Sequence, residues 1–290
     1  MMRLLFLLTF FFISNLSAQV FSQDSLVNKR MKTVVYTETA TAAVTLVGLN
    51  KLWYSDYPKS KFHFINDNKA WLQMDKIGHF TSAYYIGSLG SAAMEWTGTS
   101  KKNQLLYGAT TGLAFMTVVE VFDGYSSEWG ASMGDVLANT TGTALYIGQD
   151  LLWHEQRIMP KYSFYTTSYA PQRPNVLGTN FIEQSLKDYN GQTYWLSFNI
   201  ASFLPKSKIP KWFNLAIGYG AEGMLTAYKD SLSDTRYRQY YLSFDVDLRK
   251  IKTNSRLLKT AFKLLNIVKI PAPTVQLDAN GHLKFHTIYF

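Results

Sequence analysis

The sequence predicts an α+β protein: an N-terminal, membrane-associated bundle of about four helices, followed by a small antiparallel β-sheet with one amphipathic helix. Long apolar segments rich in small residues fill the stretch from residue 33 to residue 153. After residue 192, apolar and polar residues alternate with a period of two, which is typical of strands. Aromatic residues make up 16% of the chain, which suits a protein at a membrane interface.

The first eighteen residues have the pattern of an export signal, with Arg3, an apolar run over residues 4–13 and small residues up to Ala18. A membrane anchor is the alternative, but the run is too short to span a hydrocarbon layer of about 30 Å. The sequence contains no cysteine, so a disulfide, a thiolate metal site and a cysteine-linked lipid are not expected. The predicted organisation is a signal peptide (1–18), a helical bundle (19–154), a linker (155–192) and a β-sheet region (193–290).

Four apolar segments are the expected helices, and turn residues separate them. The polar residues 22–32 are expected to be a loose lead-in to the first helix. Small residues recur along the later segments, as at Gly87 and Gly90, Gly108 and Gly112, or Gly134 and Gly142, and they predict close helix packing. The expected helices cover residues 33–53, 75–96, 104–122 and 133–153.

Four strands are expected in the C-terminal part, at residues 193–203, 212–219, 238–248 and 282–290. Because about eight strands are needed to close a barrel, a sheet packed on helices is expected, with a partial barrel facing lipid as the alternative. The last strand ends in Phe290 and resembles the closing strand of outer-membrane β-proteins. Residues 255–268 form a basic amphipathic pattern, which predicts a helix lying on an anionic membrane or packed on the sheet.

The net charge of +9 favours an anionic partner. Nucleic acid is not expected, because an exported chain does not meet it and no binding motif is present. Membrane lipid, through anionic lipid or lipopolysaccharide headgroups, is the expected partner. Other envelope proteins or a second copy of the chain remain open as partners.

The candidate site consists of polar residues within the apolar segments. Asp75 and His79 are four residues apart, which places them one turn apart on the same face of a helix. Asp135 and Asn139 repeat that spacing, and Glu120 lies near the end of the third segment. An unpaired ionisable group in such a segment costs several kcal/mol, so these groups either pair or bind a ligand. We expect His79 to lie within about 8 Å of Asp135 or Glu120, near enough for a direct or water-bridged contact.

Three roles are open for this cluster. His79 and Asp135, or Glu120 and Lys76, could satisfy each other and fix the helix register. His79, Glu120 and Asp135 could instead bind a divalent metal. In the third role, Asp75 orients His79 as a general base of a membrane-embedded enzyme acting on a lipid or cell-wall precursor. Common enzyme signatures are missing from the sequence, so a structural or lipid-headgroup-binding envelope protein is expected, with the enzyme as the alternative.

Three sequence blocks, Asp75-Lys76-x-x-His79-Phe80, Glu120 and Asp135-x-x-x-Asn139-x-x-Gly142, occur in the same order in a known family. Over roughly residues 71–153 the chain resembles the YfiM-like exported family of unknown function, domain of unknown function 2279. The pattern is also similar to that of VanZ-like membrane proteins. Those proteins usually carry a glutamine shortly after the glutamate and an arginine in the next loop, whereas this chain has Asp123-Gly124 and then Ser126-Ser127-Glu128.

The resemblance implies an envelope location and a shared helical core, and it implies no reaction. The whole chain resembles the longer form of this family found in Bacteroidota, for which an outer-membrane location is expected rather than an inner-membrane or periplasmic one. Any role that depends on the VanZ-like arginine is not expected here.

Overall fold

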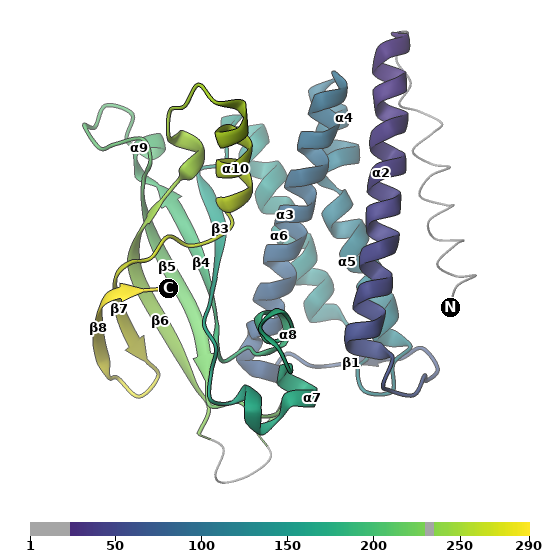
Figure 1. Ribbon diagram of the computed structural model, residues 1–290, viewed down its shortest axis with the longest axis vertical. Coiled ribbons are helices and arrows are strands. Elements are labelled where there is room, and N and C mark those ends of the chain that lie inside the picture. Colours follow the sequence, from purple (N-terminus) through teal and green to yellow (C-terminus); the bar gives the residue numbers. More distant parts are fainter. Residues whose placement is uncertain (1–23, 230–234) are drawn as a thin grey trace. The chain divides into compact units, whose positions relative to one another are not determined.

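The computed structural model describes residues 24–229 and 235–290, and it confirms the α+β prediction (Figure 1). The predicted signal peptide, residues 1–18, lies outside the described residues. The chain forms two compact units. Among the described residues, the helical unit contains 24–66 and Ser82–Leu151, and the sheet unit contains Asp67–Thr81, 152–229 and 235–290. Helix α3 (Met74–Thr97) contributes residues to both units.

The first helix, α2, covers Ser25–Leu49 and continues as a π-helical turn at Asn50–Tyr54. It begins eight residues before the predicted start at residue 33, so the expected loose lead-in is wrong from Ser25 onward. The side chain of Asp24 accepts a hydrogen bond from Leu26 N at 2.8 Å and caps the helix. No proline or glycine interrupts residues 25–32, so the helix extends through this polar stretch.

The remaining predicted helices are present. α3 follows the second apolar segment, and α6 (Met133–Trp153) follows the fourth. The third segment is divided into α4 (Lys101–Asn103), a π-helix (Gln104–Ala109) and α5 (Thr111–Gly124). Within the part of the chain that the structure describes, Lys101–Gly124 is the one helical stretch whose length and apolar composition would allow it to cross a membrane. Two short parallel strands, β1 (Phe64–Ile65) and β2 (Ala131–Ser132), join the loops of the helical unit.

Helices of the helical unit approach each other closely at the predicted small-residue positions. A Cβ atom on Gly112 would lie 2.0 Å from Ala83 O, and one on Gly87 would lie 2.3 Å from Ala109 O. Both clashes are with backbone atoms, which cannot rotate away. Gly87 and Gly112 therefore lie where the backbones of neighbouring helices touch, as the prediction of close helix packing requires.

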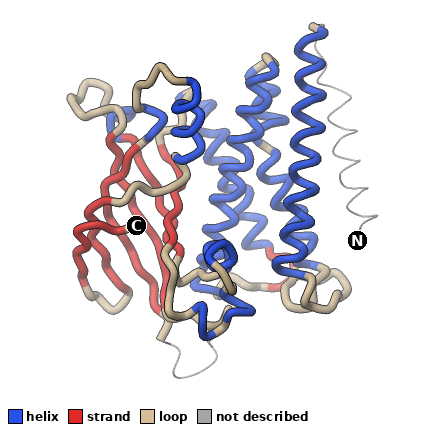
Figure 2. The backbone as a smooth tube through the Cα atoms, in the orientation of Figure 1, coloured by secondary structure: helices blue, strands red, loops and turns tan. Residues whose placement is uncertain are grey.

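The sheet has six strands rather than the four predicted, and each pairs antiparallel with the next along the chain (Figure 2). Two strands were missed, and both contain proline: Pro160 lies in the edge strand β3, and Pro273 lies beside a register shift in β7. Proline is compatible with such positions, although in a sequence it argues against a strand. β3 and three short helices occupy the range 155–192 that was expected to be a linker. The strands are β3 (Ile158–Phe164), β4 (Gln192–Asn199), β5 (Phe213–Glu222), β6 (Tyr237–Val246), β7 (Ala272–Asp278) and β8 (Leu283–Tyr289).

The sheet curls so that distant strands meet. Tyr162 of β3 donates its N–H to Ile267 O at 2.8 Å and accepts from Lys269 N at 2.9 Å, so the segment before β7 covers the free edge of β3. Tyr289 of β8 lies 3.1 Å from the hydroxyl of Thr193 on β4. The curled sheet thus encloses an interior of its own.

Short helices complete the sheet unit. α7 (Pro174–Leu177) and α8 (Phe181–Lys187) follow β3, and α9 (Ile200–Phe203) follows β4. The predicted amphipathic helix is α10 (Arg256–Leu265), which begins after its cap Ser255 and lies between β6 and β7. Short 3-10 turns occur at Ala70–Gln73, Ala170–Gln172 and Leu248–Lys250.

Candidate functional site

The candidate site begins at an unusual turn that leads into α3. Trp71, Leu72 and Gln73 have φ angles of 48°, 50° and 68°, in the left-handed region. For residues with a side chain, this conformation costs about 1–2 kcal/mol each. The turn is held by hydrogen bonds from Trp71 N to Ala227 O at 2.7 Å and from Arg238 Nη2 to Gln73 Oε1 at 2.8 Å. The sheet unit therefore fixes where α3 begins.

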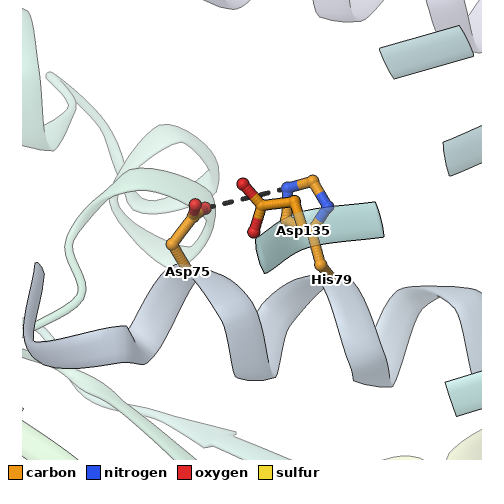
Figure 3. A group of neighbouring side chains, drawn as sticks. All are labelled: Asp75, His79 and Asp135. Atoms are coloured by element: carbon orange, nitrogen blue, oxygen red, sulfur yellow. Dashed lines mark ion pairs between the residues drawn. The ribbon is translucent and has the colours of Figure 1, made fainter. Parts of the chain in front are cut away.

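Asp75 and His79 lie one turn apart at the start of α3 (Figure 3). Asp75 Oδ1 is 3.9 Å from His79 Nε2, and it accepts a hydrogen bond from the Tyr189 hydroxyl at 2.7 Å. Lys76 forms an ion pair with Asp67 at 2.6 Å and lies 3.5 Å from Asp75 Oδ2. Asp75 is therefore the acceptor of a polar network on this turn, with a cation and a hydroxyl directed at it.

Glu120 supports the start of α6. Its carboxylate is buried and accepts a hydrogen bond from Ser132 N at 2.9 Å. The Ser132 hydroxyl in turn accepts from Gly134 N at 3.1 Å and from Asp135 N at 3.3 Å, which caps the helix. Asp135 and Asn139 follow in the first two turns of α6, and both are buried. Glu120 thus has a positioning role for the helix that carries Asp135.

Three of the five candidate residues come together. Asp75, His79 and Asp135 each offer one ligand atom, and these atoms all lie within 4.8 Å of one another (Figure 3). Two carboxylate oxygens and one imidazole nitrogen are a donor set that Zn²⁺ or Mn²⁺ accepts, and they also suit a histidine held between two acids. Glu120 does not belong to this group of described ligand atoms, and Asn139 lies one helical turn after Asp135 on α6. The catalytic and metal-binding roles of all five residues remain predictions.

Sequence reasoning missed Tyr189, which lies 114 residues after Asp75 in a stretch without a regular pattern. It also missed Tyr194, whose hydroxyl would lie 3.0 Å from a Cβ on Gly78. Gly78 thus leaves room for the hydroxyl of Tyr194, which a larger side chain at this position would crowd. A tyrosine-rich composition was visible in the sequence, but nothing in it assigned one tyrosine to Asp75.

The fold defines the chain as an α+β protein, and the comparison with protein families connects it to the cell envelope. Residues 63–148 match the family described as "Predicted periplasmic lipoprotein (DUF2279)", as the resemblance predicted, and the matched segment contains all five candidate residues. No curated protein and no solved structure matches the chain. The sequence has no cysteine that could carry a lipid, so the word "lipoprotein" in the family description does not apply to this chain.

Proposed function

We propose that the protein is an integral component of the outer membrane with a structural and lipid-binding role, in which the outer face of the curled sheet contacts acyl chains. One observation carries this proposal: the sheet is inverted, with polar residues inside and apolar residues outside.

Strand β6 has the clearest alternation. Its inward residues are polar or aromatic and are buried, among them Gln239, Ser243 and Asp245. Its outward residues Leu242 and Phe244 are 48% and 49% exposed. A sheet facing water on one side shows the opposite arrangement, with apolar residues inside. A sheet that faces lipid has an apolar outer face and a polar interior.

The neighbouring strands extend the apolar outer face. Leu242 pairs with Ile217 of β5 and Val275 of β7, and Tyr240 pairs with Leu277. Apart from Val275, these outward side chains are each between 43% and 48% exposed, so the apolar surface is continuous across three strands. Burying a fully exposed leucine or isoleucine side chain gains roughly 1.5–3 kcal/mol. These side chains are still about half exposed, so a lipid environment would supply about half of that gain for each leucine or isoleucine.

The interior contains charges that a water-soluble sheet rarely encloses. Lys161 of β3 and Asp245 of β6 are fully buried, and Lys161 Nζ lies 3.3 Å from Asp245 Oδ2. Lys161 also donates to Asn266 Oδ1 at 3.1 Å, and Asp245 accepts from Ser197 Oγ at 2.6 Å. These polar groups satisfy one another, and they share the interior with a cluster of Trp195, Ala216 and Tyr241.

The helical unit has the same inversion. Buried polar residues such as Asn139, Gln149 and Asp150 accompany outward leucines such as Leu137 and Leu151 on the same helix, α6. Ionisable and amide groups on the inside of a bundle, with leucines outside, are characteristic of a bundle in contact with lipid.

Single-cysteine labelling tests the proposal, and the cysteine-free sequence makes it direct. Leu242→Cys places a thiol on the outer face of the sheet, and Lys206→Cys places one in the exposed loop before β5. In isolated outer membranes, we expect a water-soluble maleimide to label Lys206→Cys and leave Leu242→Cys unlabelled. Detergent with a membrane-permeant maleimide should label both. Rapid labelling of Leu242→Cys in intact membranes, or release of the wild-type chain by gentle osmotic treatment, would overturn the proposal.

A second candidate function is the binding of a divalent cation, and the group Asp75, His79 and Asp135 favours it. A membrane-embedded enzyme acting on a lipid or cell-wall precursor would use the same residues, with His79 as the general base. Such an enzyme also needs an opening for the substrate. The crevice of about 570 Å³ beside α10 is lined by none of the three residues. The three ligand atoms within 4.8 Å of one another support cation binding directly.

A further inference from the structure

The segment that includes α10 concentrates positive charge. Residues 248–270 contain seven lysines and arginines and no acidic residue. Lys252, Lys259 and Lys263 are exposed, and none of the three forms an ion pair with any residue that the structure describes. By contrast, Arg249 and Lys250 are held by Asp247 at 2.9 Å and Glu155 at 3.0 Å. The segment therefore has three lysine charges left for a ligand.

These cations line a crevice. It has a volume of about 570 Å³ and lies between the turn after β6 and helix α10. Lysines enter it from both sides, with Lys252 on the turn and Lys259 and Lys263 on the helix, and Phe262 adds an apolar wall. The volume is that of a site for a small molecule or headgroup. A concave surface with several lysines attracts a phosphate as a group of point charges.

The other side of α10 is apolar and uncovered. Leu257 is 78% exposed, and Leu258, Leu264 and Leu265 are each at least 46% exposed. At about 100° per residue, these leucines form one stripe, and Lys259 and Lys263 lie on the opposite side of the helix. None of the helix residues is buried, so the sequence-based alternative of packing on the sheet does not account for the stripe. A helix divided in this way lies in a membrane interface, with its stripe toward the acyl chains.

We infer that the crevice formed by Lys252, Lys259 and Lys263 binds the phosphate of an anionic lipid headgroup, while the leucine stripe of α10 contacts the acyl chains of the same leaflet. This inference rests on the proposed membrane location and names the lipid class that the protein holds there. The charge and the apolar stripe are needed together, because a soluble phosphate would use the lysines and leave the leucines in water.

Lipid retention by the purified full chain tests the inference. The chain is purified in a neutral detergent, phosphatidylglycerol and phosphatidylcholine are offered at equal concentration, and native mass spectrometry counts the retained lipids. We expect the wild type to retain phosphatidylglycerol in preference. The triple variant Lys252→Gln/Lys259→Gln/Lys263→Gln should bind it about 10- to 100-fold more weakly, because each lysine near an anionic surface contributes on the order of tenfold or less.

A matched control removes the same charge elsewhere. Lys206, Lys208 and Lys211 are exposed in the loop before β5 and line no part of the crevice, so their triple glutamine variant should retain phosphatidylglycerol as the wild type does. Equal loss in both triple variants, or no loss in the crevice variant, would overturn the inference. Because the assay is performed in detergent, such a result would leave the labelling pattern of Leu242→Cys, and thus the proposed location, intact.

Two further arms identify the source of the phosphate. Inorganic phosphate and glycerol phosphate carry the charge without acyl chains, and we expect each to bind at least 10-fold more weakly than phosphatidylglycerol. The variant Leu257→Asn/Leu264→Asn should weaken lipid retention and leave phosphate binding unchanged. If inorganic phosphate bound as tightly as the lipid, the crevice would be a soluble-anion site, and the lipid assignment would be wrong.

Discussion

The hydroxyl of Tyr189 donates a 2.7 Å hydrogen bond to Asp75 Oδ1, and the two residues are 114 positions apart in the chain. Asp75 also faces His79 on the next turn of α3. Tyr189 therefore holds the carboxylate that lies 3.9 Å from His79 Nε2, and it supports this part of the candidate site.

Removing this hydroxyl should loosen the start of α3. Tyr189→Phe deletes a hydrogen bond to a carboxylate, which contributes about 1.5–3 kcal/mol. We expect a loss of that size in the free energy of unfolding, measured by chemical denaturation in detergent. Tyr228→Phe is the control, because Tyr228 is half exposed and its loss of a hydroxyl should change the free energy by less than about 0.5 kcal/mol. Equal effects of the two changes would contradict the role given to Tyr189.

The sequence was sufficient to predict the elements whose patterns are local. The α3 and α6 segments carry their apolar periodicity and small residues within single stretches, and the alternation of β4, β5 and β6 is equally local. The candidate pair Asp75 and His79 could be predicted for the same reason, because helical spacing alone places the two on one face.

Other features depend on contacts between distant residues. β3 and β7 contain Pro160 and Pro273, which oppose a strand locally, and pairing with β4 and β6 overrides that preference. The left-handed turn at Trp71–Gln73 also has no local signal, because residues of these types rarely adopt it. It persists through bonds to Ala227 and Arg238, more than 150 residues away. The sequence also could not show that the polar residues of the strands face inward, because alternation alone does not say which face of a strand is buried.

Metal binding by Asp75, His79 and Asp135 can be measured directly. If the group holds a cation, the purified wild type should bind Zn²⁺ near one equivalent, and His79→Gln or Asp135→Asn should each weaken binding at least 10-fold, because each removes a ligand. His282 and Asp278 provide a matched control, because they also form a histidine–aspartate pair four residues apart. His282 Nδ1 lies 2.9 Å from Asp278 Oδ2, and among the described residues this pair belongs to no group of three possible metal ligands.

His282→Gln should therefore leave Zn²⁺ binding unchanged. If all variants bound as the wild type did, the cluster would be structural only. In that case His79→Ala should lower the protein level, because the carboxylates of Asp75 and the buried Asp135 would lose the imidazole between them.

The backbone contact at Gly112 predicts a strong effect of one methyl group. In Gly112→Ala, the new Cβ would lie 2.0 Å from Ala83 O and 2.9 Å from Gly87 N, so the helices must separate. We expect a loss of about 1–3 kcal/mol in the free energy of unfolding. Gly148→Ala is the control, since nothing lies within 4 Å of its Cβ, and it should stabilise α6 by about 0.5–1 kcal/mol. A shift of the same sign in both variants would contradict the close approach of the helices.

Glu155 should make a small part of the stability depend on pH. Partial burial raises the pKa of its carboxyl, but hydrogen bonds and the charges of Lys250 and Arg157 outweigh burial and lower that pKa. A lowered folded-state pKa contributes stability above the unfolded value of about 4.3, and the contribution is lost as the pH falls through the folded pKa. Glu155→Gln should therefore lower the unfolding temperature at pH 7 and have less effect at pH 3. The same decrease at both pH values would exclude this ionic contribution.

The strongest stability effect is expected inside the sheet. Lys161 and Asp245 are both fully buried, and Lys161 is the cation nearest to the Asp245 carboxylate, at 3.3 Å. Lys161→Met would leave that carboxylate in the interior without this partner and should cost about 3–5 kcal/mol, read as a lower unfolding temperature in detergent. Replacing both residues, as Lys161→Met/Asp245→Asn, removes both charges of this pair, and the amide oxygen can still accept from Ser197 Oγ or Ile270 N. We expect the double variant to recover at least half of the loss. As a control, replacing the exposed Lys208 by Met should leave the unfolding temperature unchanged. If the double variant unfolded at a lower temperature than Lys161→Met, the stability of the interior would not depend on this ion pair.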